Sequence, residues 1–227
     1  MGKRKIYLLL LASVALAVVL LVVFNREREP EYRGKRLSEW VEENPFDAAG
    51  PDGIHPVRQM GTNAVPYLLK WIRYERPVWK RKLYAAVNPI IKRLNASWEL
   101  TDQKDSRAYG AAWTLAYFRP AVVSAVAELT MVLNDPKGPE SAIRASHVLA
   151  SLGADGLPSL IAVLTNQQMP SMHRWVVATD LGTMGTNALG AVPALLEALN
   201  DTNAEMKSKF TRTLLKIDPK ALERATP

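Results

Sequence analysis

The sequence predicts an all-α protein in which helix pairs repeat along the chain and a single transmembrane helix precedes them. Residues 6–24 are apolar and contain no charged side chain. In the rest of the chain, apolar residues at steps of three and four, typical of one helix face, recur at an interval of about 33 residues. Hydrophobic residues make up 48% of the 227-residue chain, enough for a core. Cysteine is absent, which excludes disulfides and thiolate sites.

The first element is the apolar segment from Ile6 to Phe24, which follows a basic tail over residues 1–5. As a helix it would span roughly 28 Å at about 1.5 Å per residue, close to the apolar thickness of a bilayer. A cleaved signal peptide is the alternative, because Ala-Leu-Ala at 15–17 fits a cleavage site. The apolar run continues well beyond residue 17, so we favour an uncleaved transmembrane anchor.

The charges on both sides of this segment bear on its orientation. Three basic residues precede it, and five lie between positions 26 and 36. Loop charge alone does not decide between the two orientations. A short tail is easily retained inside, so we expect a single-pass membrane protein whose main domain is extracytoplasmic. Residues 25–36, which are charged and contain Pro30 and Gly34, are predicted to be a linker.

The repeated elements start with a helix that carries the same apolar spacing in successive copies. Steps of three and four residues place these positions on one helical face, and the small residues among them allow a neighbouring helix to approach closely. The matching sets are Ala108, Ala111, Ala112, Leu115 and Phe118; Ala142, Ala145, Ser146, Leu149 and Leu152; Val177, Ala178, Leu181 and Met184; and Phe210, Thr211, Leu214 and Ile217.

A turn and a second helix follow the first helix of each unit. Glycine often occupies the turn, at positions 61, 153 and 185, where a left-handed backbone suits the end of a helix. Proline then stands near the start of the second helix, at 66, 158 and 193. Proline is tolerated there because its missing N–H would have no intrahelical partner. Each unit is therefore predicted to be a helix, a tight turn and a helix.

One unit, at about 78–105, is irregular. Residues 78–94 have helical apolar spacing, and Leu94 follows Met60 at one repeat interval, in register with the other units. Phe118, the next anchor position, then follows Leu94 well before a full interval is complete. We expect that this unit has lost most of its second helix and that residues 95–105 form a loop in its place.

The pattern resembles HEAT-like repeats of the subclass named after phycobilisome lyases. Three segments carry the resemblance: AIRASHVLASLGADGLPSLIAVL at 142–164, WVVATDLGTMGTNALGAVPALLEALND at 175–201 and KSKFTRTLLKIDPKA at 207–221. The phrases YRGKRLSEWVEE at 32–43 and HPVRQMGTNAVPYLLKWI at 55–72 also resemble membrane-anchored bacterial HEAT-repeat proteins of unassigned role. In the 118–120 turn, Phe-Arg-Pro replaces the usual apolar-Gly pair.

The resemblance implies a HEAT-like α-solenoid of about five helix pairs over residues 37–227, stacked as a right-handed superhelix. Both ends of such a stack need a cap. Leu37, Trp40 and Val41 would form the apolar side of a capping helix at the start, and residues 219–225 would form a short polar cap at the end.

The most distinctive chemical feature is a basic stretch interleaved with aromatic residues. Residues 66–107 contain ten basic and four acidic side chains. Cations and aromatic rings together bind anionic lipid headgroups, phosphates or acidic protein surfaces, although a solvated face with inward-packed rings is the simpler interpretation. The candidate partner-binding residues are Lys70, Arg73, Tyr74, Trp79, Lys80, Arg81, Lys82, Lys92 and Arg93.

No motif indicates catalysis, a metal or a cofactor. The histidines at 55, 147 and 173 have no metal-ligand spacing, and His147 is interpreted as a structural residue of a repeat helix. Glu42 and Glu43 are adjacent and so do not face each other on a helix. The Gly-Ala-Asp-Gly turn at 153–156 is not followed by Gly-Lys-Ser/Thr and is no phosphate loop. We therefore expect no catalytic, metal-binding or cofactor-binding residues.

Three functions remain open. The first is a membrane-tethered, non-catalytic scaffold whose second helices, over 66–75, 126–133, 158–165 and 193–199, line a groove for a protein or peptide partner. A lyase-type enzyme or cofactor-chaperone subunit is the second, although no residue set indicates a tetrapyrrole site. The third is a protein that binds an anionic lipid surface through residues 70–93. A nucleic-acid partner is not expected.

Overall fold

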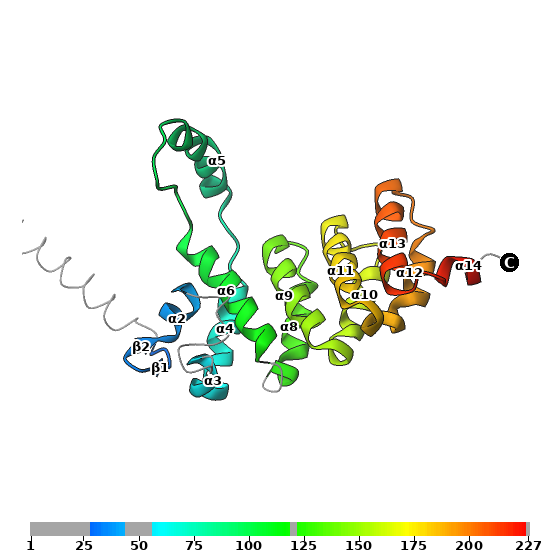
Figure 1. The fold of residues 1–227 in the computed structure, drawn as a ribbon, viewed down its shortest axis with the longest axis horizontal. Helices are drawn as coiled ribbons and strands as arrows, with labels where there is room; N and C mark the ends of the chain where they lie inside the picture. Colours follow the sequence, from blue (N-terminus) through cyan, green and yellow to red (C-terminus); the bar gives the residue numbers. More distant parts are fainter. Residues whose placement is uncertain (1–27, 44–55, 119–121, 226–227) are drawn as a thin grey trace, which may run out of the picture.

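The protein is mostly helical, and its helices follow one another in a row (Figure 1). The structure is a computed structural model that describes residues 28–43, 56–118 and 122–225. The all-α prediction is therefore confirmed, with the addition of a short two-stranded hairpin near the start of the described chain. The predicted anchor at 6–24 lies outside the described residues. Among the residues described, no helix has the length and apolar character needed to cross a bilayer.

The first part of the chain forms the start of the row and one helix outside it. Its elements are β1 Glu31–Tyr32, β2 Lys35–Arg36, α2 Leu37–Glu43, α3 Pro56–Met60, the 3-10 helix η1 Gly61–Ala64, α4 Val65–Ile72, α5 Val78–Arg93 and α6 Gln103–Tyr117. The helix α5 stands apart, above the row in Figure 1, while α4 and α6 pack against each other directly.

The second part of the chain continues the row. Its elements are η2 Val123–Ala125, α8 Val126–Leu133, α9 Pro139–Ser151, η3 Gly153–Asp155, α10 Leu157–Thr165, α11 Ser171–Met184, η4 Gly185–Ala191, α12 Val192–Ala198, α13 Ala204–Ile217 and α14 Ala221–Ala225. Neighbours in the row are in contact: α6 packs on α9, α9 on α11, and α11 on α13. The second helix of each pair packs against the first helix of the next unit: α4 on α6, α8 on α9, α10 on α11 and α12 on α13.

One continuous apolar core runs through the row. The positions that the repeat spacing selects lie in it, since Ala111, Leu115, Ala145, Leu149 and Leu181 are fully buried. Small residues at the centre of each first helix allow the next helix to pack closely, as their spacing predicts. Burial of this face against the next unit is the main source of stability, because one helix pair cannot cover its own apolar side.

The turns between paired helices follow the predicted chemistry. Gly61, Gly153 and Gly185 have backbone φ angles of 64°, 66° and 56°, in the region that glycine enters without steric cost. Each is the first residue of a 3-10 helix, and the prolines at 66, 158 and 193 lie in the first turn of α4, α10 and α12. The repeated helix–turn–helix unit is present at these three places.

The predicted linker is more ordered than its composition suggests. Its described part, residues 28–36, forms the β1–β2 hairpin and docks on the start of the row. The Tyr67 hydroxyl of α4 donates to the backbone carbonyl of Arg28 at 2.9 Å. The Glu29 carboxylate accepts from the backbone N–H of Ser38 at 2.9 Å, at the start of α2. These hydrogen bonds therefore hold residues 28–36 against the helices, so the segment is not simply a solvated linker.

The irregular unit differs from the expected one. A helix is present over 78–93, and residues 95–102 are not helical, but α6 already starts at Gln103. Leu94 does not occupy a buried anchor position, because it is 74% exposed. The region is an insertion between α4 and α6 that leaves the row, and α4 packs on α6 as if the insertion were absent.

Candidate functional site

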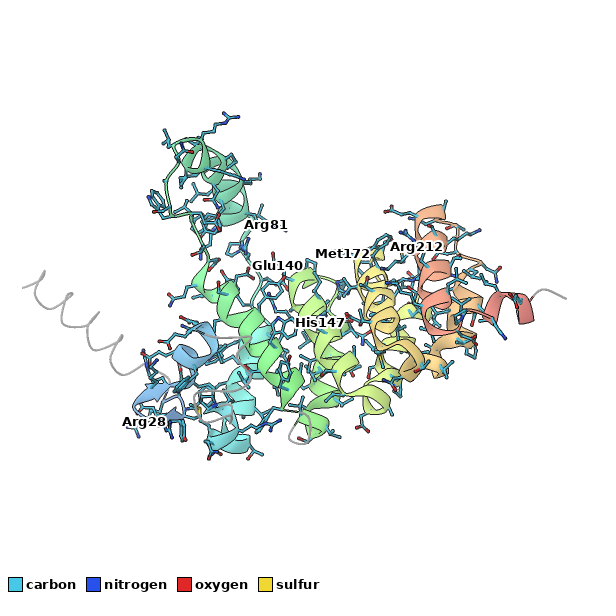
Figure 2. All side chains as sticks on the ribbon, viewed as in Figure 1. Arg28, Arg81, Glu140, His147, Met172 and Arg212 are labelled. Atoms are coloured by element: carbon cyan, nitrogen blue, oxygen red, sulfur yellow. The ribbon has the colours of Figure 1, made fainter. Side chains whose placement is uncertain are left out.

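The insertion, residues 73–102, forms an arm that projects from the row. Its helix α5 has 16 residues, a length of roughly 24 Å. Figure 2 shows Arg81 on this arm, above Glu140 at the start of α9. The large apolar side chains of the arm are mostly exposed. The exposed set is Val78 55%, Trp79 63%, Leu83 43%, Ile90 54%, Leu94 74% and Trp98 62%.

One face of α5 is covered by residues 95–102, the returning segment of the arm, which leads from α5 back to α6. The Asn88 side chain bonds Leu100 twice: its amide donates to the backbone carbonyl at 3.1 Å, and its oxygen accepts from the backbone N–H at 2.9 Å. The Tyr84 hydroxyl donates to the backbone carbonyl of Thr101 at 3.4 Å. Ile91 on the same side is buried. The segment thus closes against one side of the helix and leaves the other side open.

The open side of α5 carries an apolar stripe. We define the stripe as Trp79, Leu83, Ala86, Ile90 and Leu94, all of which are exposed. Steps of four, three, four and four place them on one helical face. Within the described part of the chain, no neighbouring element covers this face.

The base of the arm is held by charged and polar groups. The Tyr74 hydroxyl donates to Asp102 at 2.8 Å, and the Lys80 ammonium donates to the same carboxylate at 3.1 Å. Burial alone would raise the pKa of Asp102, but the hydrogen bonds from Tyr74 and Lys80 outweigh it and keep that pKa below its usual range. The hydrogen bond to Asp102 in turn raises the pKa of Lys80. The two ends of the arm are therefore joined.

A second group of charges joins the arm to the row. The fully buried Arg144 of α9 donates to the backbone carbonyls of Ile72, at 3.0 Å, and of Tyr74. It also pairs with Asp105 of α6 at 3.2 Å, and Arg76 bonds the other oxygen of that carboxylate. Arg144 thus fixes the exit of α4 and the start of α6 at one point.

The chain entering the arm also caps α9. The Glu75 carboxylate accepts from the backbone N–H groups of Glu140 and Ser141, at 3.2 and 2.6 Å. The Glu140 carboxylate accepts from the backbone N–H of Arg76 at 2.9 Å. These bonds satisfy donors in the first turn of α9 and tie it to the arm base.

The structure separates the nine predicted partner-binding residues into three groups. Three take part in contacts within the chain: Arg73 pairs with Glu128 at 2.9 Å, while Tyr74 and Lys80 bind Asp102. Lys70 is exposed on α4, away from the stripe in sequence. The others lie exposed on the arm, namely Trp79, Arg81, Lys82, Lys92 and Arg93. Their role in binding stays a prediction.

A groove of about 900 Å³ crosses three consecutive first helices. It is lined from α6, α9 and α11 and from the turns after α9 and α11. This hollow is lined by first helices, whereas the predicted groove on the second helices stays a prediction. The reason is geometric: the first helices pack directly on one another, α6 on α9 and α9 on α11, so their outer faces form a continuous surface.

Aromatic rings form one wall of this groove. The rings of Trp113 and Tyr117 stack with centroids 6.4 Å apart, and the ring of His147 meets Trp113 edge-on at 5.7 Å. Tyr117 is 49% exposed, so its ring is accessible. Small residues at Ala150 and Gly153 widen the groove beside these rings. This wall offers the flat apolar contact on which binding surfaces depend.

A carboxylate lies at the middle of the groove. Asp180 of α11 accepts from Ser146 at 2.5 Å and contacts His147 Nδ1 at 3.0 Å, and it is buried. The hydrogen bond to Asp180 raises the pKa of His147. Figure 2 shows His147 in the middle of the row. The pair links α9 to α11 and turns a half-exposed imidazole toward the groove.

This cluster lacks the geometry of nucleophilic catalysis. Ser146 and His147 both bond the same Asp180 carboxylate, whereas a serine nucleophile needs its hydroxyl next to the imidazole that removes its proton. In the described ranges, no three His, Asp or Glu side chains come close enough together to hold a metal ion. His173 is buried at the start of α11.

The sequence contained a signal for the groove that the motif search missed. Trp113, His147 and Asp180 follow one another at close to the repeat interval. Equivalent positions of stacked repeats are neighbours in space. Comparing equivalent positions of successive first helices brings these residues together.

No family model, curated protein or solved structure matches the chain. The resemblance to HEAT-like repeats therefore stays a prediction that the sequence motifs support.

Proposed function

We propose that this protein is a membrane-tethered, non-catalytic HEAT-like α-solenoid scaffold that binds an extended segment of a partner protein in the groove over α6, α9 and α11. The observation that carries the proposal is the continuity of the groove across three repeat units, with the Trp113–Tyr117 stack on one wall. A surface built from successive repeats suits an elongated ligand better than a compact one.

The dimensions of the groove favour a peptide. Helices pack at about 10 Å, so three of them span roughly 20 Å. An extended peptide of about six residues covers that distance. The stacked rings would take an apolar or aromatic side chain of the peptide. Asn187, exposed at the far wall, offers an amide for its backbone.

The tether is part of the proposal. The apolar segment 6–24 is long enough to span a bilayer, and its short basic tail favours an extracytoplasmic domain. Because the chain has no cysteine, Met131→Cys, at a residue that is 64% exposed on α8, gives a single labelling site. We expect a membrane-impermeant maleimide to label this variant in intact cells. Labelling only after the cells are opened would contradict the extracytoplasmic placement.

Peptide selection on the full-length protein in detergent tests the groove. Peptides from a random library would be selected on the wild type, and their affinities measured by fluorescence anisotropy. We expect Trp113→Ala to weaken binding about thirtyfold, since a central aromatic anchor contributes about 2 kcal/mol. Tyr117→Ala and Asn187→Ala, at exposed residues, should weaken it about tenfold or less without disturbing the fold.

Met131→Ala is the matched control, because Met131 is exposed and does not line the groove. We expect it to bind the selected peptides like the wild type. Peptides that bind all four variants equally would show that the groove is not the site. The lyase-type alternative has no specific observation in its favour and is not pursued.

A further inference from the structure

The apolar stripe of α5 is exposed in a fold that buries the same kind of stripe elsewhere. Trp79, Ile90 and Leu94 are 63%, 54% and 74% exposed. The returning segment covers the opposite side of α5 and does not reach these residues. Exposed apolar surface of this kind indicates an interaction surface. We therefore expect another molecule or surface to cover the open face of the arm.

The charge around the stripe identifies the chemistry of that occupant. Residues 76–98 contain six basic side chains and no acidic one. Arg76 and Lys80 pair with carboxylates at the base of the arm, and the other four, Arg81, Lys82, Lys92 and Arg93, are exposed. Lys82 lies three residues after Trp79 and four before Ala86, and Arg93 lies three after Ile90, so both flank the stripe on the helix. Both are exposed. The surface thus joins an apolar strip to an unbalanced positive charge.

We propose that α5 lies in the headgroup region of an anionic membrane, with its stripe in the apolar boundary and Lys82 and Arg93 among the lipid phosphates. Amphipathic helices with tryptophan on the apolar face and basic residues beside it bind in this way. Trp79 and Trp98, both exposed, suit the interface because an indole ring is apolar with one polar N–H.

The same charge disfavours a second copy of the chain as the occupant. Two stripes that faced each other would bring two arms of the same positive sign together, at an electrostatic cost. A bilayer that contains anionic lipid has the opposite sign and no fixed shape to match. Complementary charge therefore favours the lipid surface over self-association.

Contacts at the base of the arm fix the position of α5 relative to the row. Asp102 bonds Tyr74 and Lys80, and Arg144 fixes the chain on both sides of the base. An arm that is held in this way presents its stripe at a set position relative to the row. This inference rests on the arm and is independent of the peptide groove, so either can fail without the other.

Single cysteines in the full-length protein test the proposal, since the natural chain has none. Leu83→Cys and Ile90→Cys place an environment-sensitive nitrobenzoxadiazole label on the stripe. Ala85→Cys is the matched control, at an exposed residue of the same helix outside the stripe. Each protein would be reconstituted into vesicles of phosphatidylcholine, with and without phosphatidylglycerol, and quenched by lipids that carry a spin label on the acyl chain.

We expect labels at 83 and 90 to be quenched several-fold more strongly than the label at 85, and only in vesicles with phosphatidylglycerol. Adding Lys82→Glu and Arg93→Glu to the Ile90→Cys protein should reduce membrane contact about tenfold or more, because each basic residue near an anionic surface strengthens binding about fivefold. Circular dichroism of these variants should match the wild type, since the changed side chains are exposed.

Two outcomes would overturn the proposal. Equal quenching at 83, 85 and 90 in both kinds of vesicle would show that the stripe does not contact lipid. Unquenched labels, together with efficient disulfide cross-linking between two molecules of the Ile90→Cys protein, would show that a second copy covers the stripe.

Discussion

The helices α5 and α13 have the same kind of sequence and opposite surroundings. Apolar residues recur at helical spacing in both, at 206, 210, 214 and 217 in α13 and at 79, 83 and 90 in α5 and at 94, the residue that caps it. In α13 they are all buried against α11 and α12. On the arm all four are exposed. An amphipathic pattern thus predicts that a helix has a covered face, but it does not say whether the cover is the protein itself or another surface.

The charges of the two regions differ in the same way. Arg144 and Arg174 of the row are buried, and each pairs with a carboxylate of a neighbouring helix or the turn beside it. On the arm, Arg81, Lys82 and Arg93 are exposed to solvent. In the row these arginines pair with carboxylates and hold helices together, whereas on the arm the three basic side chains are exposed to solvent.

The largest expected effect separates the two regions by deletion. Removing residues 204–227, which include α13, would expose the apolar surface that α11 and α12 now share with four buried side chains. We expect the free energy of unfolding to fall by roughly 6 kcal/mol or more, at about 1.5 kcal/mol per buried side chain. Urea denaturation of the full-length protein in detergent, followed by circular dichroism, measures this.

Excising the arm is the matched experiment. Residues 78–101 form a segment of the same length, and their removal brings Phe118 to one repeat interval after Met60. We expect a loss of about 1 kcal/mol or less, because the described side chains that join this segment to the base make the partly exposed Lys80–Asp102 pair and the contact of Arg76 with the ring of Tyr84. A loss as large as that of the first deletion would mean that the arm is part of the core.

The second prediction concerns the charge that holds the arm to the row. Arg144→Met removes one of the two basic partners of Asp105, leaving Arg76, and it leaves the carbonyls of Ile72 and Tyr74 without this donor. Breaking a buried pair on one side should lower the free energy of unfolding by about 3–5 kcal/mol. Arg81→Met, on the exposed face of the arm, should change it by about 0.5 kcal/mol or less. Equal losses would contradict the distinction between the two regions.

The third prediction tests close packing inside one unit of the row. A side chain at Gly156 would place its Cβ onto the backbone carbonyl of Leu149, so Gly156→Ala should cost about 1–3 kcal/mol. Gly182→Ala in α11 is the control, because its Cβ would meet only ordinary contacts, the nearest at 3.5 Å from Lys216. We expect that variant to be neutral or more stable by up to about 1 kcal/mol. Thermal unfolding measures both.

The smallest effect is a pH dependence within the row. Burial lowers the pKa of His173, so below about pH 6.5 the unfolded chain binds a proton that the folded chain does not. Stability therefore falls as the pH drops below about 6.5. We expect His173→Leu to reduce this fall, by about 1 kcal/mol or less between about pH 7 and pH 5. An unchanged pH profile of the melting temperature would contradict the role of His173.

His147 should show the opposite sign. Its hydrogen bond to Asp180 raises its pKa, so its contribution to stability is complete below about pH 6.5 and is lost as the pH rises through the raised value. The side chain is half exposed, so solvent screening limits the effect to a few tenths of a kcal/mol. His147→Gln should remove that gain, and the melting temperatures of the two histidine variants would then diverge with pH in opposite directions.

Much of the row could be predicted from the sequence because its rules are local. Residues three and four apart share a helix face, so Leu115 and Leu149 could be placed in the core from their spacing alone. Gly153 could be placed in its turn because few other residues adopt its φ angle without strain. These features depend on neighbours within one or two helices.

The position of the arm and the groove could not be obtained in this way. The direction of α5 depends on bonds between residues far apart in sequence, such as Arg144 with Tyr74, and no local pattern encodes them. The insertion also breaks the repeat interval, which led Leu94 to be placed in register although it is exposed. The groove residues are each ordinary in their own helix, and only the stacking of α6, α9 and α11 makes them a set.

The cap that Glu75 provides for α9 has a mechanical consequence. A force applied to the tip of the arm reaches its base, where Glu75 and Arg76 clasp the first turn of α9. The load is then shared between α4 and α9, and α9 is the middle one of the three helices that line the groove. Tension on the arm would therefore reach the groove through one helix, α9.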